Sequence, residues 1–291
     1  MRNTTIDIQP VTGGLGAELQ GVDLGAPLDE RTYLDIRAAL NEYGVIFFRD
    51  QKLTPTQHLA FGRRFGALVP GRGELVPDFP ELAVVRKEPE QKHNIGGDWH
   101  SDHSFLPKPP LGTVLYALDL PPVGGDTLFL DMAKAYDTLS DGLKKTLDGL
   151  NAVHSLGKLY DKLRSRKADS IKIRDNAQEP EALHPVVIPH PETGRKVLYI
   201  NETYTVRFEG WTREESEPLL QFLYAHARRP EFSCRFRWQR GSVAFWDDRQ
   251  VWHYAVNDYH GERRVMHKLI VEDSPPAAAR DPSQHSNSGA L

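Results

Sequence analysis

Short apolar runs, separated by turns that contain glycine and proline, fill the middle and the end of this sequence. Runs of this kind predict strands, and many short strands in succession favour a barrel or a jelly roll. We therefore expect a mainly β chain with flanking helices outside the β core. The predicted strands are Val45–Phe48, Val114–Leu118, Thr127–Leu130, Ala152–Leu156, Val197–Ile200, Ser233–Trp238, Val243–Trp246, His253–Val256 and Val265–Val271.

Periodic apolar residues and capping residues predict helices between these strands. Gly44 can end a helix that begins at Pro27, and Thr54 with Pro55 forms an N-cap and a first helical turn. The sequence that starts at Thr212 is a capping box. Residues 160–181 are charged and poor in turn signals, so we expect a mobile lid or loop there. The predicted helices are residues 27–44, 54–65, 140–150 and a segment that begins after position 212.

Composition limits the class of protein. We expect a single domain over residues 1–273, and a disordered tail over residues 274–291, which are rich in Pro, Ala and Ser. A net charge of −4 argues against a polybasic nucleic-acid surface. The one cysteine excludes an intrachain disulfide and a cysteine-rich metal site. No apolar run is long enough for a membrane helix, so we expect a cytoplasmic protein with no nucleic-acid or membrane partner.

The segment Trp99-His-Ser-Asp102 holds the first candidate metal ligands. Residues two apart in a strand point to the same side, so His100 and Asp102 could present an imidazole nitrogen and a carboxylate oxygen to one metal ion. The triplet is weak on its own, because His-x-Asp sequences arise by chance and a solvated surface turn is the alternative. A third ligand must come from another segment.

His253 is the best third ligand. It follows an apolar strand and a charged turn, and it begins the next predicted strand. Two histidines and one carboxylate form the facial triad of non-haem Fe(II) oxygenases, which leaves coordination positions open for other ligands. Taken alone, His253 would be interpreted as a histidine packed beside aromatic residues.

Arg264 and Thr127 are candidates for binding a dicarboxylic acid. A strand, a turn and a returning strand after His253 would bring Arg264 inside the same barrel, and an arginine binds a carboxylate through two parallel hydrogen bonds. Thr127, in Gly124-Gly-Asp-Thr127, adds a hydroxyl donor at the start of a strand. A surface ion pair is the alternative interpretation of Arg264.

Together these residues resemble the Fe(II)/2-oxoglutarate-dependent dioxygenases of the taurine dioxygenase and phenoxyalkanoate herbicide dioxygenase family. The resemblance covers roughly residues 6–273, and the order and spacing of its blocks are specific. The blocks are Gly16–Asp23, Trp99–Asp102, Gly124–Thr127, His184–Val187, His190–Gly194, Trp246–Arg249, His253–Ala255 and Arg263–His267.

The resemblance implies a double-stranded β-helix, or jelly-roll, core. It implies that His100, Asp102 and His253 hold Fe(II). It also implies that Arg264 and Thr127 bind the C5 carboxylate of 2-oxoglutarate, with dioxygen as the other cosubstrate. The implied reaction hydroxylates a small organic anion (an aryloxyalkanoate, a sulfonate or an alkyl sulfate ester) and releases succinate and CO2. Where the hydroxylated carbon carries a leaving group, the bond to that group then breaks.

Several residues match pocket positions of this family and are candidates for substrate binding. Lys268 follows Arg264 by four residues on the same strand face, and it stands where taurine dioxygenase has an anion-binding arginine. Arg72 is a second candidate anion contact, with a solvated loop arginine as the alternative. Gly71 and Gly96 align with polar substrate contacts of taurine dioxygenase, which argues against taurine itself. A candidate apolar wall, for which ordinary core or lid packing is the alternative, consists of Phe105, Leu159, Tyr160 and Tyr204.

Other functions stay open at this point. A hydroxylase of an amino-acid-derived or natural-product acid is an alternative within the class, and a non-catalytic jelly-roll binding module is an alternative outside it. A halogenase is disfavoured, because halogenases of this chemistry lack the carboxylate ligand and Asp102 is present. The family resemblance also implies a homodimer or a homotetramer.

Overall fold

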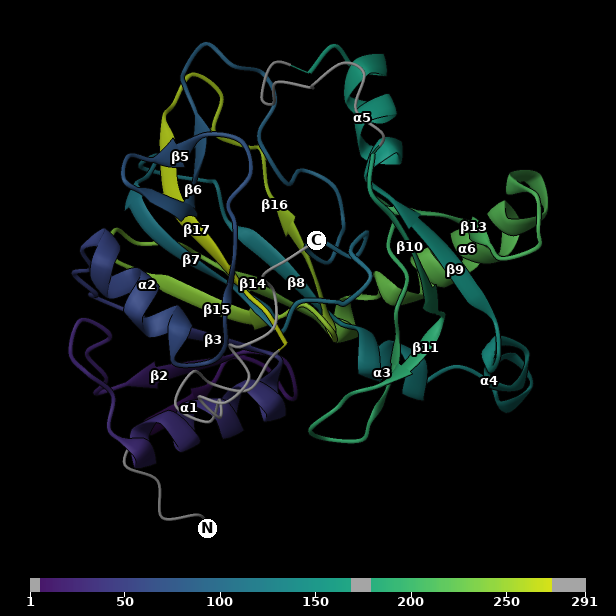
Figure 1. Ribbon diagram of the computed structural model, residues 1–291, viewed down its shortest axis with the longest axis horizontal. Coiled ribbons are helices and arrows are strands. Elements are labelled where there is room, and N and C mark those ends of the chain that lie inside the picture. Colours follow the sequence, from purple (N-terminus) through teal and green to yellow (C-terminus); the bar gives the residue numbers. More distant parts are fainter. Residues whose placement is uncertain (1–5, 169–178, 274–291) are drawn as a thin grey trace, which may run out of the picture.

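The computed structural model describes residues 6–168 and 179–273. The predicted tail, 274–291, and part of the predicted lid lie outside the described residues. One large sheet dominates the described part of the chain (Figure 1). Its strands, in spatial order, are β1 (Asp7–Pro10), β2 (Ala17–Gln20), β3 (Val45–Phe48), β15 (Val243–Asp247), β7 (Gly112–Asp119), β17 (Arg264–Val271), β6 (Phe79–Lys87) and β5 (Leu75–Val76), and β4 (Leu68–Val69) pairs with β17.

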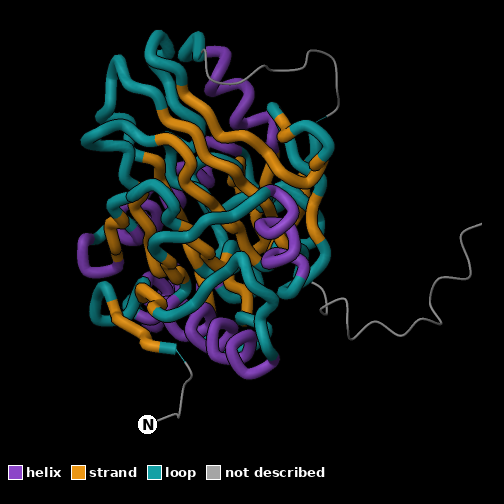
Figure 2. The backbone as a smooth tube through the Cα atoms, turned by 90° about the vertical axis from the view of Figure 1, so that its left-hand side faces the viewer, coloured by secondary structure: helices purple, strands orange, loops and turns teal. Residues whose placement is uncertain are grey.

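Smaller sheets accompany the large one, and strands run through the middle of the molecule with helices at its edges (Figure 2). The sheet that matters for the site has the order β14 (Ser233–Phe236), β8 (Thr127–Asp131) and β16 (Val251–Ala255). A second has the order β10 (Glu181–Pro185), β9 (Asn151–Ser155) and β13 (Thr205–Phe208), and a two-stranded sheet pairs β11 (Val187–Pro189) with β12 (Lys196–Leu198).

The two faces of the large sheet bury different side chains. Along β3, Ile46 and Phe48 point to the face that α1 (Glu30–Tyr43) and α2 (Pro55–Arg63) cover. Val45 and Phe47 point the other way, into a second core shared with the β14–β8–β16 sheet. This alternation follows from the two-residue period of a strand, and it makes the space between the two sheets an apolar interior.

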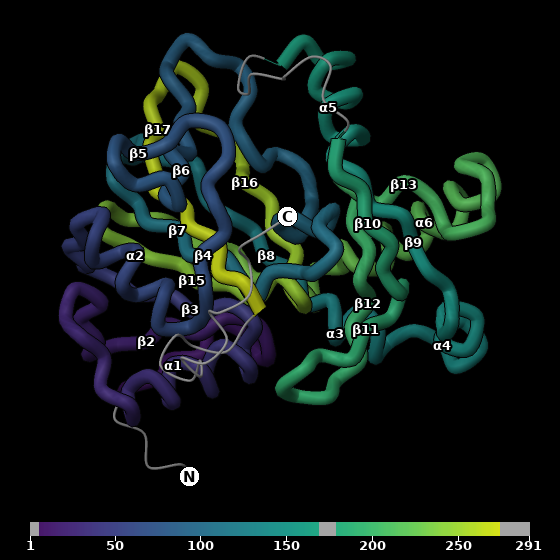
Figure 3. Tube along the Cα trace, in the orientation of Figure 1, coloured from purple at the N-terminus to yellow at the C-terminus, as the bar shows by residue number. Residues whose placement is uncertain are grey.

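The remaining elements form a third core on the side away from α1 and α2 (Figure 3). Helix α6 (Arg213–Ala227) contributes Leu220, Leu223 and Tyr224 to it, and β16 contributes Trp252. The other elements on this side are α3 (Met132–Asp137), α4 (Asp141–Leu147), α5 (Leu156–Ser165) and the short 3-10 helix η1 (Pro230–Phe232).

The expectation of a mainly β chain with flanking helices is confirmed. Each predicted strand overlaps an observed one, and the capping boxes at Thr54 and Thr212 both form. The first helix was predicted to begin at Pro27 but begins at Glu30, because the Asp29 side chain accepts a hydrogen bond from the Thr32 amide and caps it there. Strand β6 was not predicted, since its first half carries proline and glutamate rather than an apolar run.

The segment expected to be a mobile lid or loop is not a loop over its first residues, because Tyr160 lies within helix α5. The leucines and tyrosine of this helix pack on one side, so a charged segment that looked featureless has an apolar face. Residues 169–178 of the predicted lid lie outside the described residues. No helix in the described residues combines the length and the hydropathy that a bilayer crossing requires.

A buried ionic network at the β15–β16 turn fixes this part of the fold. Arg249 donates to both carboxylate oxygens of Asp247, at 2.9 and 2.5 Å, and His190 Nε2 lies 2.9 Å from Asp247 Oδ2. Burial alone would raise the pKa of Asp247, but Arg249 and His190 outweigh burial and hold that pKa well below its ordinary value. Arg249 also reaches Glu192.

Replacing Arg249 with methionine should therefore destabilise the protein by about 3–5 kcal/mol, since it leaves the Asp247 carboxylate buried without its cation. The matched control is Arg195→Met, whose ion pair with Asp137 is exposed and should contribute about 0–1 kcal/mol. Urea unfolding at several pH values measures both effects. The lowered pKa of Asp247 stabilises the folded protein at pH values above the ordinary pKa of an aspartate, and this stabilisation is lost as the pH falls. The difference in unfolding free energy between the wild-type protein and Arg249→Met should therefore shrink as the pH falls. Equal losses for the two variants would contradict this role.

Candidate metal centre and cosubstrate pocket

A pair of backbone hydrogen bonds joins the His100 segment to strand β16. The His253 amide donates to the His100 carbonyl at 2.8 Å, and the His100 amide donates to the His253 carbonyl at 3.2 Å. The two residues form an isolated bridge, and their imidazole rings lie 4.0 Å apart between centroids. This bridge brings together two histidines that are far apart in the sequence.

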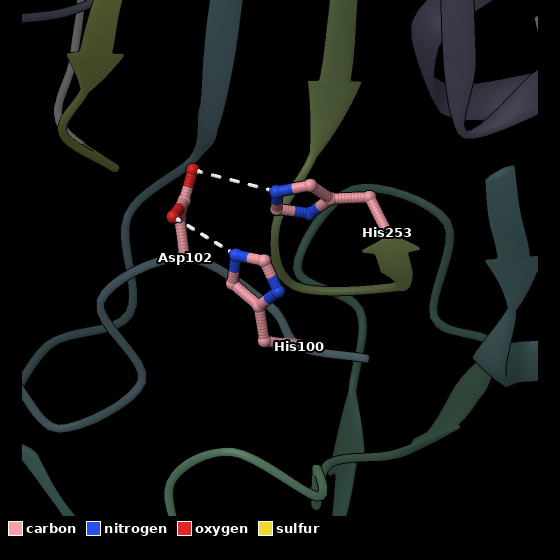
Figure 4. A group of neighbouring side chains, drawn as sticks. All are labelled: His100, Asp102 and His253. Atoms are coloured by element: carbon pink, nitrogen blue, oxygen red, sulfur yellow. Dashed lines mark ion pairs between the residues drawn. The ribbon is translucent and has the colours of Figure 1, made fainter. Parts of the chain in front are cut away.

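The three predicted metal ligands converge on one point (Figure 4). His100 Nε2 lies 3.7 Å from Asp102 Oδ1, and His253 Nε2 lies 3.9 Å from Asp102 Oδ2. One ligand atom from each of the three side chains lies within 4.8 Å of the others, and all three residues are buried. Two imidazole nitrogens and a carboxylate oxygen at such distances fit an Fe(II) ion.

The histidines are in the state that metal binding needs. Burial lowers the pKa of His100 and holds that of His253 well below its ordinary value, so both rings are neutral near pH 7. His100 Nδ1 lies 2.7 Å from the Asp98 carbonyl oxygen, which accepts a hydrogen bond from Nδ1–H and leaves Nε2 with a free lone pair for a metal ion. His253 is further held by the Trp246 ring, at 4.5 Å between centroids.

Asp102 is surrounded by donors. Its backbone amide donates to Asp248 Oδ1 at 3.0 Å, Thr113 Oγ1 lies 3.0 Å from its Oδ2, and Lys268 Nζ lies 3.3 Å from each carboxylate oxygen. Burial would raise the pKa of Asp102, but Lys268, His253 and His100 outweigh burial and keep that pKa well below its ordinary value. The side chain is therefore an anionic ligand.

The expectation that Trp99–Asp102 is a strand is wrong. Only His100 makes a bridge, and Asp102 lies in the turn that follows it. The two side chains share a side because the His100–His253 bridge holds one and Asp248 holds the backbone of the other. His100 and Asp102 do lie on one side, as strand alternation predicted, but they are not in a strand and other contacts place them there.

Arg264 and Thr127 both lie beside Trp238, in the interior between the two sheets. Arg264 lies 5.8 Å from the centre of the Trp238 ring, and Trp238 Nε1 donates to Thr127 Oγ1 at 2.9 Å. Arg264 is buried, yet its Nε and Nη2 atoms have no hydrogen-bond partner in the described part of the chain. Unpaired buried donors on a guanidinium are costly, so this cradle fits the carboxylate of a bound ligand.

The predicted apolar wall forms beside His100. Phe105 and Tyr204 pack edge to face at 5.0 Å between ring centroids, and the Tyr204 ring lies 6.2 Å from that of His100. Leu159 and Tyr160 of α5 pack against this cluster. The structure therefore brings all four predicted wall residues together at the metal centre.

The two predicted anion contacts lie at different members of the site. Lys268 faces Asp102 from β17, with 22% of its side chain exposed. The Arg72 guanidinium lies 5.3 Å from the centre of the Phe105 ring and is otherwise exposed. One cation thus lies at a predicted metal ligand and the other at the predicted wall.

Comparisons with known proteins agree on one family. Residues 7–270 match the family described as taurine catabolism dioxygenase TauD, TfdA. The chain belongs to the TauD/TfdA family.

Its relatives are oxygenases of this type. An alkylsulfatase of Acinetobacter baylyi is 34% identical over 91% of this chain and 84% of its own. An (S)-phenoxypropionate/alpha-ketoglutarate-dioxygenase of Sphingobium herbicidovorans is 35% identical over 92% of this chain and 95% of its own. A crystal structure of a taurine dioxygenase from Burkholderia xenovorans superposes with a TM-score of 0.79 at 36% identity, over 93% of this chain and 92% of that one. The protein is an Fe(II)- and 2-oxoglutarate-dependent dioxygenase.

The sequence alone did not identify the residues that form hydrogen bonds to the predicted metal ligands His100 and Asp102. The Asp98 carbonyl accepts a hydrogen bond from His100. The Asp98 side chain pairs with Lys162, at 2.8 Å, and Arg166, at 3.0 Å, and so ties α5 to the ligand loop. Asp248 and Thr113 hold Asp102. A signal existed for Asp248, because it is the second of two successive aspartates at the end of a fully buried strand.

The surroundings of Asp248 favour the neutral form of its carboxyl group. Burial raises its pKa well above the ordinary value, and the neighbouring Asp102 raises it further. Its Oδ1 accepts from the Asp102 amide and from Trp246 Nε1, at 3.0 and 2.9 Å, and its Oδ2 lies 2.7 Å from Thr113 Oγ1. A protonated Oδ2 donates to Thr113, whose hydroxyl is then free to donate to Asp102.

Asp248→Asn should therefore keep metal affinity within about threefold, since the amide oxygen and nitrogen reproduce this pattern. Asp248→Leu removes the acceptor for the Asp102 amide and should weaken metal binding by about 10–100-fold. Titration with Mn(II), followed by electron paramagnetic resonance, measures both affinities in folded protein. A large loss in the asparagine variant would show that the charged form of Asp248 is required.

Proposed function

We propose that this dioxygenase hydroxylates a small organic anion held between Lys268 and an aromatic wall. The observation that carries the proposal is the set of groups around the three-residue ligand cluster. These groups are the unpaired Arg264 donors, the Lys268 ammonium at Asp102 and the aromatic pair beside His100. The two sheets that enclose these groups support a jelly-roll core. We further propose that residues 1–273 act as a single dioxygenase domain.

In this proposal His100, Asp102 and His253 hold Fe(II), and the chain supplies the neutral imidazoles and the anionic carboxylate that the ion needs. Arg264 and Thr127 bind the far carboxylate of 2-oxoglutarate. Bound there, iron, 2-oxoglutarate and dioxygen supply an oxidation in which one oxygen atom enters succinate and the other enters a substrate C–H bond, with release of CO2. The intact ligand cluster argues against a non-catalytic binding module.

The substrate side is proposed from charge and shape. Lys268 has three N–H donors and points two of them at the Asp102 oxygens, which leaves one for a substrate anion. Phe105 and Tyr204 form an aromatic pair beside His100, and Arg72 adds a second cation over the Phe105 ring. The similarity to an alkylsulfatase and to a phenoxypropionate dioxygenase supports an aryloxyalkanoate, an alkyl sulfate ester or a sulfonate.

A substrate panel tests the proposal. Anions of these three classes, together with amino-acid-derived acids and neutral isosteres, are supplied with Fe(II), 2-oxoglutarate and dioxygen, and succinate and the primary product are both measured. We expect at least one anion to give succinate and product in equal amounts. A neutral isostere that is turned over better than every anion would overturn the anion-site assignment.

Arg264→Ala should raise the 2-oxoglutarate concentration needed for half-maximal rate far more than the corresponding value for the primary substrate. A charge-assisted bidentate contact to a buried carboxylate is worth on the order of 2–5 kcal/mol. Thr127→Val should act in the same direction but less, because it removes one neutral hydroxyl. Steady-state kinetics with each substrate varied in turn measure both shifts, and equal shifts for the two substrates would refute the assignment.

Lys268→Ala should weaken binding of the anionic substrate by roughly 1.5–3 kcal/mol, the worth of a hydrogen bond to a charge. The 2-oxoglutarate requirement should change little, so succinate would form without matching primary product. Lys268→Arg should keep or improve activity on sulfonates, whose oxygens suit a planar fork. Since Lys268 also contacts Asp102, Mn(II) affinity is measured in the same variants. An unchanged KM for the anion in Lys268→Ala would contradict the proposal.

A further inference from the structure

A second buried cation lies directly beside Arg264. Lys87 is the last residue of β6 and is 1% exposed. In the antiparallel pairing of β6 with β17, Lys87 is the partner of Arg264, and Val85 is the partner of Met266. Residues paired in this way place their side chains on the same face of the sheet.

That face is the interior between the two sheets. Met266 belongs to the core that the large sheet shares with β14, β8 and β16, and Val85 packs against the same core. Lys87 lies two residues from Val85 in β6, and Arg264 lies two residues from Met266 in β17, so each pair points to the same face of the sheet. Both cations therefore project into the region where Arg264 meets Trp238.

The contacts of Lys87 leave its charge largely uncompensated. Its Nζ donates to the Tyr259 carbonyl oxygen at 3.3 Å and lies 4.4 Å from the centre of the Tyr259 ring. The Asp126 carboxylate, whose charge acts on Arg264, is paired with Arg235 at 2.6 Å. Within residues 6–168 and 179–273, neither Lys87 nor Arg264 forms an ion pair with a carboxylate.

Two adjacent buried cations without a counter-charge repel each other and lose hydration, so the site as it stands favours an anion. Arg264 alone would satisfy a carboxylate's hydrogen bonds. A second positive charge adds attraction that depends on the charge of the ligand and hardly on its shape. Tyr259, which contacts the Lys87 ammonium through both ring and carbonyl, fixes where that charge lies.

We propose that Lys87 is a specificity-determining residue for the cosubstrate, which selects a 2-oxo acid with a second, distal carboxylate over one without it. The inference rests on the proposed binding of that carboxylate by Arg264. Lys87 acts through its charge and through the Tyr259 segment, as a positioning residue rather than a catalytic one.

The test compares the binding of 2-oxoglutarate with that of 2-oxovalerate, which has the same chain length but ends in a methyl group. Anaerobic calorimetry with Mn(II)-loaded protein gives both dissociation constants without turnover. Lys87→Gln removes the charge and keeps a donor for the Tyr259 carbonyl, and Lys87→Met is a second neutral variant of similar size. The matched control is Arg86→Met on the adjacent, outward-facing position, where the arginine pairs with Glu74.

We expect Lys87→Gln to raise the dissociation constant of 2-oxoglutarate by about tenfold and to leave that of 2-oxovalerate within about twofold. Arg86→Met should change neither. If the neutral variants weaken both acids equally, or neither, Lys87 is only structural and the inference is wrong. Arg264→Met distinguishes a failure of the Lys87 inference from a failure of the proposed carboxylate pocket. If Arg264→Met also leaves 2-oxoglutarate binding unchanged, the proposed pocket itself is wrong. If only Arg264→Met weakens 2-oxoglutarate binding, the pocket stands and the role of Lys87 is wrong.

Discussion

The backbone bridge between His100 and His253 is the contact on which the metal centre depends. It ties an irregular loop to a strand of the smaller sheet, so that two rings of unrelated segments lie 4.0 Å apart. Everything else at the centre is arranged around that bridge: Asp98 orients one ring, and Asp248 holds the turn that carries Asp102. Loop ligands become as fixed as strand ligands because their backbone hydrogen bonds are satisfied by the sheet.

Charge in the sheet interior is the second organising constraint. Between the two sheets the chain places aromatic and aliphatic side chains, and near this apolar region it buries Asp102, Arg264 and Lys87 and leaves Lys268 partly exposed. Lys268 and Asp102 compensate each other, whereas Arg264 and Lys87 have no acidic partner in the described residues. The interior thus favours a metal cation at Asp102 and an anion at Arg264 and Lys87.

The sequence was sufficient to predict elements that follow from periodic patterns and short-range hydrogen bonds. It was not sufficient to predict roles that arise from contacts between distant segments. Strands such as β3 and the helix caps at Thr54 and Thr212 follow from short-range periodicity and hydrogen bonding, and they form as expected. The three predicted ligands lie together in the structure, and they could be proposed from the sequence because residue types restrict metal chemistry. Asp248 was missed because its role comes from a backbone amide 146 residues away, and Lys87 was missed because only strand register reveals its neighbour.

The measurement that tests the account most directly is the visible absorption of the protein mixed anaerobically with Fe(II) and 2-oxoglutarate. Chelation of the iron by the 2-oxo acid gives a weak metal-to-ligand charge-transfer band, which needs the ligand cluster and the carboxylate cradle together. The account predicts the band in the wild-type protein, its absence in folded His253→Ala, and a higher 2-oxoglutarate concentration for half its intensity in Arg264→Ala. No band in the wild-type protein, or an undiminished band in His253→Ala, would contradict the assignment of the metal centre.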